Sequence, residues 1–516
     1  MNNEKALTVG IIGLGNIGQE VARQLLAAGK GKVRWILDRT PEKQKKSEII
    51  NEITKTQDEA PKIITSVEEL ANVEEVHFVI EATGDIDAVN FLRKIREVWN
   101  KRVTFVTANK AAVAKNMREY FSDNMDVRME ASVAGGLPII RSLSEHISAD
   151  KFLGLVAILN GTTNYILERL SEDDFNEKDQ YNEALADAVI SGYAEPTGKG
   201  DVDGLDSGNK LLILARIAYG KEIDSNEVLR SDIVRGINAE EDCFDRIRYC
   251  DFWYARHSLR HTIKLIALTC PAFDEQQSKE PFFLVHTMLV PFNSKIAKIT
   301  GIDNYVTVRS EHLGYIDLQG KGAGPQPTAC AVLADVYGGT ISNSTLQKAG
   351  EKSTVQSSKE IYFGRWMVRA CCYDKPGVLA ALFNSLHQFG IGIDEVFQIQ
   401  RDDKDFRKCK DLLGIPRDIR DWESIVPFAF TTTGIDLYTL RSALKKVFSE
   451  ALNCKKEDCF FPKVRHLFAM YPILINATTE GEPKINGKDD AHGNAIIERK
   501  RFFNMEPRPY PSVLCK

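Results

Sequence analysis

Apolar runs of strand length alternate with amphipathic or charged segments over the first 140 residues. The apolar runs are Leu7–Ile12, Lys32–Asp38, Val76–Gly84 and Val103–Thr107, and Val127–Ile140 holds a further strand and a Gly-Gly-Leu-Pro turn. Strands that alternate with helical segments are typical of βαβ units and of a parallel sheet. This pattern predicts an α/β domain of the doubly wound type over residues 1–138.

The hydrophobic pattern changes twice further along the chain. Residues 139–310 hold a strand, a polar loop and a helix (Phe152–Leu170), a buried helix after position 210, and strand patterns in HTIKLIALTC and PFFLVHTMLV, which predict an α+β domain. The polar stretch 340–361 predicts a linker. Residues 362–452 then read strand–turn–helix–strand followed by a strand and a helix, and 453–516 match no known pattern, so their role stays unassigned.

Length and composition agree with a protein of several globular domains. The 516 residues suffice for about three domains, and 43% are hydrophobic. The net charge of -5 argues against nucleic-acid binding, which needs a basic face. No run approaches the ~18 apolar residues of a membrane span, and the chain starts directly on a strand without a signal segment. We therefore expect a cytoplasmic protein without nucleic-acid or membrane partners.

The first strand leads into a glycine-rich turn and a helix. The turn is Gly13-Leu14-Gly15-Asn16-Ile17-Gly18, a G-x-G-x-x-G pattern in its strand–turn–helix setting. Its glycines allow a tight turn and let backbone N–H groups approach a pyrophosphate at the helix N-terminus. The pattern predicts NAD or NADP binding through Gly13, Gly15, Asn16, Ile17 and Gly18.

The preference between the two cofactors stays open. Asp38 ends the second strand, where an acid usually binds the ribose hydroxyls of NAD. Arg39 follows it, with Lys43, Lys45 and Lys46 beyond, and these cations could hold a 2′-phosphate.

Two further strands end in polar residues at the predicted ligand edge. Thr83 lies in the small-residue turn that ends the stretch Val76–Gly84, and Asn109 and Lys110 follow the strand Val103–Thr107. Ligands of open α/β sheets bind beyond the carboxyl ends of the strands. We expect Thr83 to contact the cofactor, and Lys110 to reach the nicotinamide or the substrate.

The stretch from 192 to 210, GYAEPTGKGDVDGLDSGNK, concentrates acids and lysines before an apolar helix. Asp206 and Lys210 are four residues apart and share a helix face. A surface ion pair is the alternative reading of this spacing. The loop Asn160–Asn164 precedes another helix and offers donors that suit a carboxylate ligand.

Six motifs occur in one order between Leu7 and Gly339: GLGNIG, TANKAAVA, EASVAGGLPII, NGTTNYIL, GYAEP…DVDGLDSGNKLLILA and GKGAGPQPTACAVLAD. In this order they resemble the homoserine dehydrogenase family. The resemblance implies a Rossmann-type nucleotide domain, completed by residues 311–340 with Gly322 near the cofactor. It also implies a substrate domain whose open sheet helps to form a homodimer or homotetramer.

The resemblance also implies an activity and roles for individual residues. The activity is the NAD(P)-dependent interconversion of L-aspartate 4-semialdehyde and L-homoserine in threonine, methionine and isoleucine biosynthesis. Lys210 and Lys110 match catalytic lysines, Glu195 matches the contact to the substrate amino group, and Asp201 and Asp206 match substrate-site acids. Family members hold a sodium or potassium ion at the positions of Glu130, Val133, Gly135 and Leu137. The chain departs from the family at PTGKGD, which adds Lys199.

The segment 362–452 resembles the ACT domain, a βαββαβ sensor of small molecules. Asp374 and Gly377 match its D-x-x-G effector turn. The resemblance implies regulation by L-threonine, and a purely structural dimerisation module is the alternative.

Two other functions compete with this interpretation. An acylating semialdehyde dehydrogenase needs a thiolate nucleophile, and none of the ten cysteines precedes Cys243, which argues against that class. A nucleotide-binding metabolite sensor without catalysis would explain the glycine-rich turn and the C-terminal domain, but it would not require Lys110, Glu195, Asp206 and Lys210 to converge.

Overall fold

The nucleotide-binding domain is built on a parallel sheet. The computed structural model describes residues 7–99, 103–121, 126–172, 180–191, 193–194, 202–230, 247–271, 281–338, 363–399, 406, 424–453 and 468–472. The strands of this sheet are β1 (Leu7–Ile12), β2 (Gly31–Leu37), β3 (Lys62–Ile64), β4 (Phe78–Glu81), β5 (Thr104–Thr107) and β6 (Asp126–Arg128). Their order is β3-β2-β1-β4-β5-β6 and all pairs are parallel. This is the strand order of a Rossmann fold, so the predicted fold class is confirmed.

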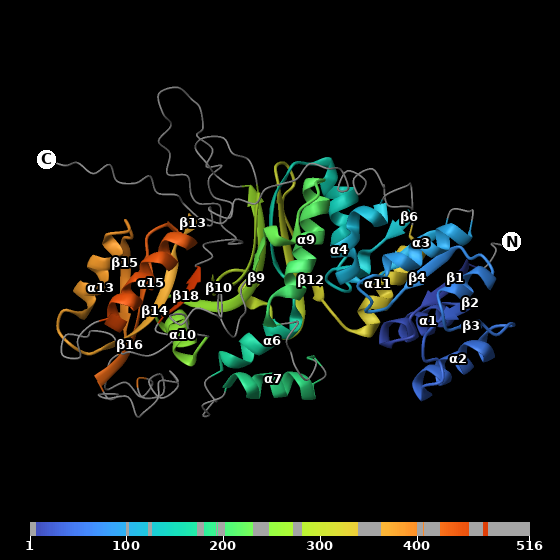
Figure 1. Ribbon diagram of the computed structural model, residues 1–516, viewed down its shortest axis with the longest axis horizontal. Helices are drawn as coiled ribbons and strands as arrows, with labels where there is room; N and C mark the ends of the chain where they lie inside the picture. Colours follow the sequence, from blue (N-terminus) through green and yellow to red (C-terminus); the bar gives the residue numbers. More distant parts are fainter. Residues whose placement is uncertain are drawn as a thin grey trace, which may run out of the picture.

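The helices of this domain are α1 (Asn16–Ala28), α2 (Gln44–Thr56), α3 (Val89–Val98), α4 (Lys110–Phe121) and α11 (Pro325–Tyr337), with the short turns η1 (Glu68–Asn72) and η3 (Glu130–Ser132). Helix α1 forms because its apolar side chains recur on one face, and Val21 and Leu25 are fully buried. Helix α11 begins 309 residues after the start of α1 and packs against it (Figure 1, yellow beside blue). The chain therefore returns to the nucleotide domain through α11.

The substrate domain has a mixed sheet. Its strands are β7 (Phe152–Ile158), β8 (Val228–Arg230), β9 (His261–Pro271), β10 (Pro281–Pro291), β11 (Asp303–Ser310) and β12 (Gly314–Lys321), in the order β12-β11-β7-β9-β10-β8. Its helices are α6 (Gly161–Leu170), α7 (Gln180–Ile190), α9 (Leu205–Tyr219) and α10 (Tyr249–Trp253), with η6 (Ser225–Glu227), η7 (Tyr254–Ser258) and η8 (Ile296–Lys298). The segments α5 (Ile139–Arg141), η4 (Ser142–His146) and η5 (Ile147–Ala149) lead into it. Helix α9 is buried along almost its whole length, as its apolar sequence predicts.

The C-terminal domain has an antiparallel sheet with two helices. Its sheet has the order β15-β16-β14-β18, formed by β14 (Trp366–Tyr373), β15 (Ile393–Gln398), β16 (Ile425–Thr432) and β18 (Phe468–Pro472). The helices are α13 (Val378–His387) and α15 (Leu437–Asn453), and β13 (Phe363–Gly364) pairs with β17 (Ile435–Asp436). Along the chain the order is β14-α13-β15-β16-α15-β18, which is βαββαβ. Its last strand comes from the segment after 453, for which the sequence predicts no structure.

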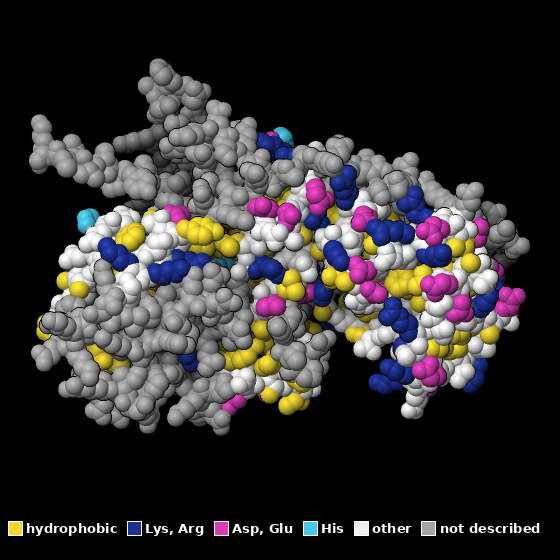
Figure 2. Space-filling view, in the orientation of Figure 1, with side chains coloured by type: hydrophobic (Ala, Val, Ile, Leu, Met, Phe, Trp, Pro, Cys, Tyr) yellow, Lys and Arg dark blue, Asp and Glu magenta, His cyan; other side chains and the backbone are white. Residues whose placement is uncertain are grey.

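The three domains lie in a row, with the substrate domain in the middle (Figure 1). On the face shown in Figure 2, basic and acidic side chains are interspersed over the nucleotide domain and do not gather by sign. No helix in the described part of the chain is long and apolar enough to cross a membrane.

Candidate functional site

Asp206 and Lys210 face one another on the first turns of helix α9. The carboxylate oxygen Oδ2 of Asp206 lies 2.8 Å from Nζ of Lys210, and the side chains are only 7% and 8% exposed. The helix starts after Gly204, which has a left-handed φ of 71°, and its apolar remainder is anchored in the core. Burial therefore argues against the surface ion pair and favours a site.

Lys110 joins this pair from the nucleotide domain. It is the first residue of α4, directly after the loop that follows β5, and its ammonium group forms an ion pair with Oδ1 of Asp206. The Lys110 side chain is 46% exposed, whereas Asp206 is almost fully buried. Each carboxylate oxygen of Asp206 is thus paired with one lysine, and Lys110 is the lysine that is exposed to solvent.

The loop after β7 completes the polar wall around Asp206. Asn160 donates from Nδ2 to Oδ2 of Asp206 at 2.9 Å and caps α6 by accepting from the backbone N–H of Thr163 at 2.8 Å. The carbonyl of Leu159 accepts from Nζ of Lys210 at 2.6 Å and from Nδ2 of Asn304 at 3.1 Å. The ammonium of Lys210 is therefore held between a carboxylate and a carbonyl.

The charges of this cluster keep Asp206 ionised. Burial by itself would raise the pKa of Asp206, but the ammonium groups of Lys210 and Lys110 hold it well below its usual range. A carboxylate that stays ionised at all ordinary pH values can orient a lysine in its protonated form.

The glycine-rich turn has the geometry of a pyrophosphate cradle. Gly13 has a left-handed φ of 90°, and an added Cβ would come within 2.7 Å of Thr83. A Cβ at Gly18 would overlap the carbonyl oxygen of Gly13, so only glycine lets the helix approach the turn. Gly15 precedes α1, whose first residues are Asn16 and Ile17, and the space where a Gly15 side chain would lie is open. The residues present therefore fit a dinucleotide.

Asp38 is buried at the end of β2 and already has several partners. It accepts from the backbone N–H groups of Leu14 at 2.7 Å and Thr40 at 2.9 Å, and it pairs with Lys46. Burial alone would raise its pKa, but these contacts keep the pKa below its usual value. Arg39 is 78% exposed, with its nearest acid, Asp85, at 3.5 Å. Arg39, Lys43 and Lys45 are thus exposed cations beside Asp38, and Lys46 is the cation that pairs with it.

A second buried carboxylate, Glu81, orders the ligand edge of the sheet. It ends β4 and accepts hydrogen bonds from the backbone N–H of Thr83 at 2.8 Å and from the hydroxyl of Thr107 at 2.5 Å. Burial raises the pKa of Glu81. Asn109 donates to Glu81 at 3.4 Å and to the carbonyl of Asp85 at 2.7 Å. These bonds fix the loop that carries Lys110.

The candidate cation loop packs against Gly322. Ala134 and Gly135 both have a left-handed φ of 55°, and a Cβ on Gly135 would lie 2.7 Å from the carbonyl carbon of Gly322. The carboxylate of Glu130 accepts from the backbone N–H groups of Ile140 at 2.9 Å and Arg141 at 2.8 Å. Burial raises the pKa of Glu130 to about 7, with a further contribution from Asp335. A buried acid of this kind fits the charge of a cation.

Val133 and Leu137 are the two remaining residues of the candidate cation loop. Val133 directly follows η3, and the carbonyl of Leu137 accepts from the backbone N–H of Ile139 at 2.9 Å.

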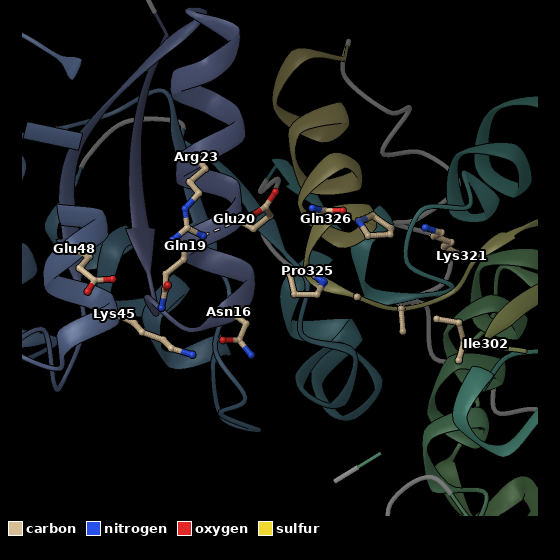
Figure 3. A pocket seen from close by; sticks show the side chains of 13 residues that line it. Asn16, Gln19, Glu20, Arg23, Lys45, Glu48, Ile302, Lys321, Pro325 and Gln326 are labelled. Carbon is tan, nitrogen blue, oxygen red and sulfur yellow. Dashed lines mark ion pairs between the residues drawn. The ribbon is translucent and has the colours of Figure 1, made fainter. Parts of the chain in front are cut away.

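A groove of about 590 Å³ runs between α1 and α2 on one side and the segment that leads into α11 on the other (Figure 3). Asn16 of the glycine-rich turn, Lys45 of α2 and Gly324 before α11 line it. The groove therefore extends outward from the cradle, along the end of the domain where the sequence predicts the cofactor.

Several predicted site residues lie outside the described residues or away from the cluster. Glu195, Lys199 and Asp201 belong to segments that the structure does not describe. Asp374 and Gly377 lie in an exposed turn of the C-terminal domain, where Gly377 precedes α13 with a left-handed φ of 88°.

Sequence reasoning missed four residues that shape the site. Three are Glu81, the carbonyl of Leu159 and Asn304, described above. The fourth is Lys264 on β9, which is 3% exposed and donates to Oδ1 of Asn164 at 2.9 Å and to the carbonyl of Ile299 at 2.7 Å. Burial lowers the pKa of Lys264 to about 8. The sequence signal that could have identified Lys264 is a lysine within the otherwise apolar strand pattern HTIKLIALTC.

Comparisons with known proteins identify the family. The homoserine dehydrogenase of Helicobacter pylori is 31% identical over 407 residues, covering 77% of this chain and 89% of that protein. The homoserine dehydrogenase of Mycobacterium tuberculosis is also 31% identical, over 412 residues. The chain belongs to the homoserine dehydrogenase family. The family model described as homoserine dehydrogenase matches residues 138–337, and one described as NADP oxidoreductase, coenzyme F420-dependent, matches residues 8–104.

Solved structures agree with this assignment at the level of the fold. A homoserine dehydrogenase from Thiobacillus denitrificans superposes with a TM-score of 0.68 at 24% identity, covering 91% of this chain and 98% of the other. One from S. aureus has a TM-score of 0.59 at 20% identity and the same coverage of this chain. The protein is an NAD(P)-dependent oxidoreductase of this family. This membership favours the enzyme over the sensor without catalysis.

Proposed function

We propose that this protein interconverts L-aspartate 4-semialdehyde and L-homoserine with NAD or NADP, in the biosynthesis of threonine, methionine and isoleucine in the cytoplasm. The observation that carries the proposal is the cluster of Lys210, Asp206 and Lys110 at the junction of the nucleotide and substrate domains. The cluster brings two cations and one ionised acid to the edge of the sheet where a cofactor is expected to end.

Lys210 is the proposed proton donor and acceptor. The aldehyde oxygen gains negative charge as hydride reaches its carbon, and an ammonium group can stabilise this charge and then transfer a proton. Asp206 and the carbonyl of Leu159 fix the direction of the Lys210 ammonium. Lys110 supplies a second positive charge from the exposed side, where the substrate approaches.

The nicotinamide cofactor supplies or accepts the hydride. Gly13, Gly15, Asn16, Ile17 and Gly18 are the proposed pyrophosphate contacts, and Gly322 and Thr83 are proposed for the nicotinamide half. Asp38 and Arg39 are proposed for the adenosine ribose. Glu195 and Asp201, with Asp206, are the proposed contacts to the substrate.

An assay of the purified protein tests the proposal. We expect homoserine to drive the reduction of NAD or NADP, and the semialdehyde to drive the oxidation of the reduced form. L-Serine, which lacks one methylene, serves as the control substrate. Absence of turnover with both cofactors and both substrates would contradict the proposed function.

We also propose a monovalent cation, sodium or potassium, at Glu130, Val133, Gly135 and Leu137. The support is the raised pKa of the buried Glu130 carboxyl, which a bound cation would relieve. We expect potassium or sodium chloride to raise the unfolding temperature above that in choline chloride at equal ionic strength. Equal unfolding temperatures would count against the site.

The substrate domain is proposed to form a homodimer or homotetramer.

The C-terminal domain is proposed to bind L-threonine at the turn that carries Asp374 and Gly377. The βαββαβ order of the C-terminal domain supports this effector role. We expect millimolar L-threonine to inhibit the enzyme, with D-threonine as the control. Identical rates with and without L-threonine would contradict the effector role.

A further inference from the structure

Asn304 lies on the strand that separates the catalytic carbonyl from the cofactor loop. Strand β11 has β7 as one neighbour and β12 as the other. In the register of the sheet, Tyr305 lies opposite Ile158, and Asn304 lies opposite Gly320. Leu159 follows directly after β7, and Gly322 follows directly after β12. Asn304 is therefore placed between the two functional loops by the sheet itself.

The side chain of Asn304 contacts both loops. Its Nδ2 donates to the carbonyl of Leu159 at 3.1 Å, and the same carbonyl accepts from Nζ of Lys210 at 2.6 Å. A Cβ added to Gly322 would overlap the carboxamide of Asn304. The cofactor loop thus rests on a side chain that also helps to hold the catalytic lysine.

The carboxamide of Asn304 is held in one orientation. Asn304 is 0% exposed, and its oxygen Oδ1 has no hydrogen-bond partner among the described residues. A flipped amide would set Oδ1 against the carbonyl oxygen of Leu159, which is repulsive, so the donor must point to Leu159. Gly322 is confined from another direction by Gly135. A buried amide with one unsatisfied oxygen is costly to keep, which indicates a role beyond filling space.

We propose that Asn304 is a positioning residue that couples the cofactor loop at Gly322 to the orientation of Lys210. The inference rests on the proposed role of Lys210 in proton transfer. A displacement of the loop toward β11 presses on the carboxamide, and the carboxamide transmits the displacement to the Leu159 carbonyl. Occupation of the cofactor site and alignment of the lysine are linked in this way.

The substitution Asn304→Leu separates the hydrogen bond from the packing. Leucine has a similar branched shape and supports Gly322, but it donates nothing to Leu159. We expect kcat to fall about tenfold, the effect of losing one buried hydrogen bond, with the Kd for the cofactor unchanged. The control is Val306→Ala on the same strand, which should lower the unfolding temperature without changing kcat. An unchanged kcat in Asn304→Leu would overturn the proposal.

A double-mutant cycle tests the contact with the cofactor loop. Gly322→Ala adds a methyl group where the carboxamide lies, and we expect it to weaken cofactor binding at least tenfold. In the Asn304→Ala background the methyl group has room, so the same substitution should weaken binding less than threefold. Additive effects on the cofactor Kd would overturn the coupling.

The two measurements also separate this inference from the proposed function. Fluorescence titration of the reduced cofactor gives Kd without any turnover. Lack of turnover in the unsubstituted protein would contradict the proposed function itself, whereas the affinity cycle still decides whether Asn304 and the cofactor loop are coupled.

Discussion

The substrate domain meets its neighbours at two junctions, and a buried carboxylate pairs with a cation at each. Toward the nucleotide domain, Asp206 pairs with Lys110, whose side chain is 46% exposed. Toward the C-terminal domain, Asp251 on α10 pairs with Arg369 on β14 at 2.7 Å, and both side chains are 0% exposed. We call the first the open junction, because one of its partners reaches solvent, and the second the sealed junction, because neither partner does.

The surroundings show the same difference. At the junction of Asp251 and Arg369, the buried Tyr254 also donates a hydrogen bond from its hydroxyl to the carbonyl of Pro427 at 3.0 Å. Around Asp206 the neighbours are two lysines and an asparagine. An ion pair that is sealed from water can fix two domains but cannot act on a ligand. We propose that the open junction performs the chemistry and that the sealed junction holds the C-terminal domain in place.

The largest effect on the open junction is expected from Lys210→Ala. We expect kcat to fall by about three orders of magnitude because the proposed general acid is lost, while the cofactor Kd stays unchanged because Lys210 is on α9 and not in the cradle. Steady-state rates and fluorescence titration measure the two quantities. Lys115→Ala on α4, a half-exposed lysine outside the cluster, is the control and should keep full activity. Retained turnover in Lys210→Ala would refute its acid–base role.

The sealed junction is broken by Arg369→Met. Removing one partner leaves the Asp251 carboxylate buried without its cation, and we expect a loss of about 3 kcal/mol in the free energy of unfolding. Chemical denaturation monitored by fluorescence measures it. The double variant Arg369→Met/Asp251→Asn should recover part of this loss, because no charge is then left buried. A single variant as stable as the unsubstituted protein would show that the pair does not hold the junction.

Asp206→Asn sharpens the comparison because it keeps the shape of the open junction and removes its negative charge. We expect kcat to fall about a hundredfold, since the two lysines then repel one another and Lys210 is no longer aligned. The matched change at the sealed junction, Asp251→Asn, should leave kcat unchanged. Equal effects of the two substitutions on kcat would remove the distinction between the junctions.

The smallest expected effect concerns His286 on β10, whose ring lies 5.9 Å from Trp366 of the C-terminal domain. Burial lowers the pKa of His286 to about 4. Protonation therefore favours the unfolded state, so stability is fully present above pH 6.5 and is lost as the pH falls toward 4. At pH 5 the loss is about 2 kcal/mol. We expect His286→Phe to flatten this dependence between pH 7 and pH 5, as measured by denaturation at each pH. If the free energy of unfolding of His286→Phe depended on pH as steeply as that of the unsubstituted protein, the role of His286 would be contradicted.

The sequence predicted the local features of the molecule well. The glycine-rich turn, the strand–helix alternation and the i,i+4 spacing of Asp206 and Lys210 are short-range patterns, and each has a direct structural consequence. The position of Lys110 at the ligand edge was predicted because ligands of parallel sheets bind beyond the carboxyl ends of the strands. The ion pair of Lys110 with Asp206 agrees with that position.

The sequence could not predict contacts that the tertiary fold creates. Asn304 meets Leu159 across 145 residues, and the acceptor is a backbone carbonyl, which any residue provides. Arg369 lies in a segment that reads as an ordinary strand, Asp251 lies in a segment for which the sequence analysis predicts no element, and only domain packing makes them a pair. The strand β18 lies in the segment after 453, whose sequence matches no known pattern.

Chemical rescue of Lys210→Ala tests most directly whether Lys210 supplies the proton for hydride transfer. Small primary amines such as methylamine and ethylamine can occupy the space left by the side chain and replace its ammonium group. We predict that they restore turnover in a saturable way, with rates that follow the pKa of the amine. Tetramethylammonium, which has the charge but no proton, should restore nothing. Rescue by tetramethylammonium, or no rescue by any amine while cofactor affinity is intact, would contradict the account.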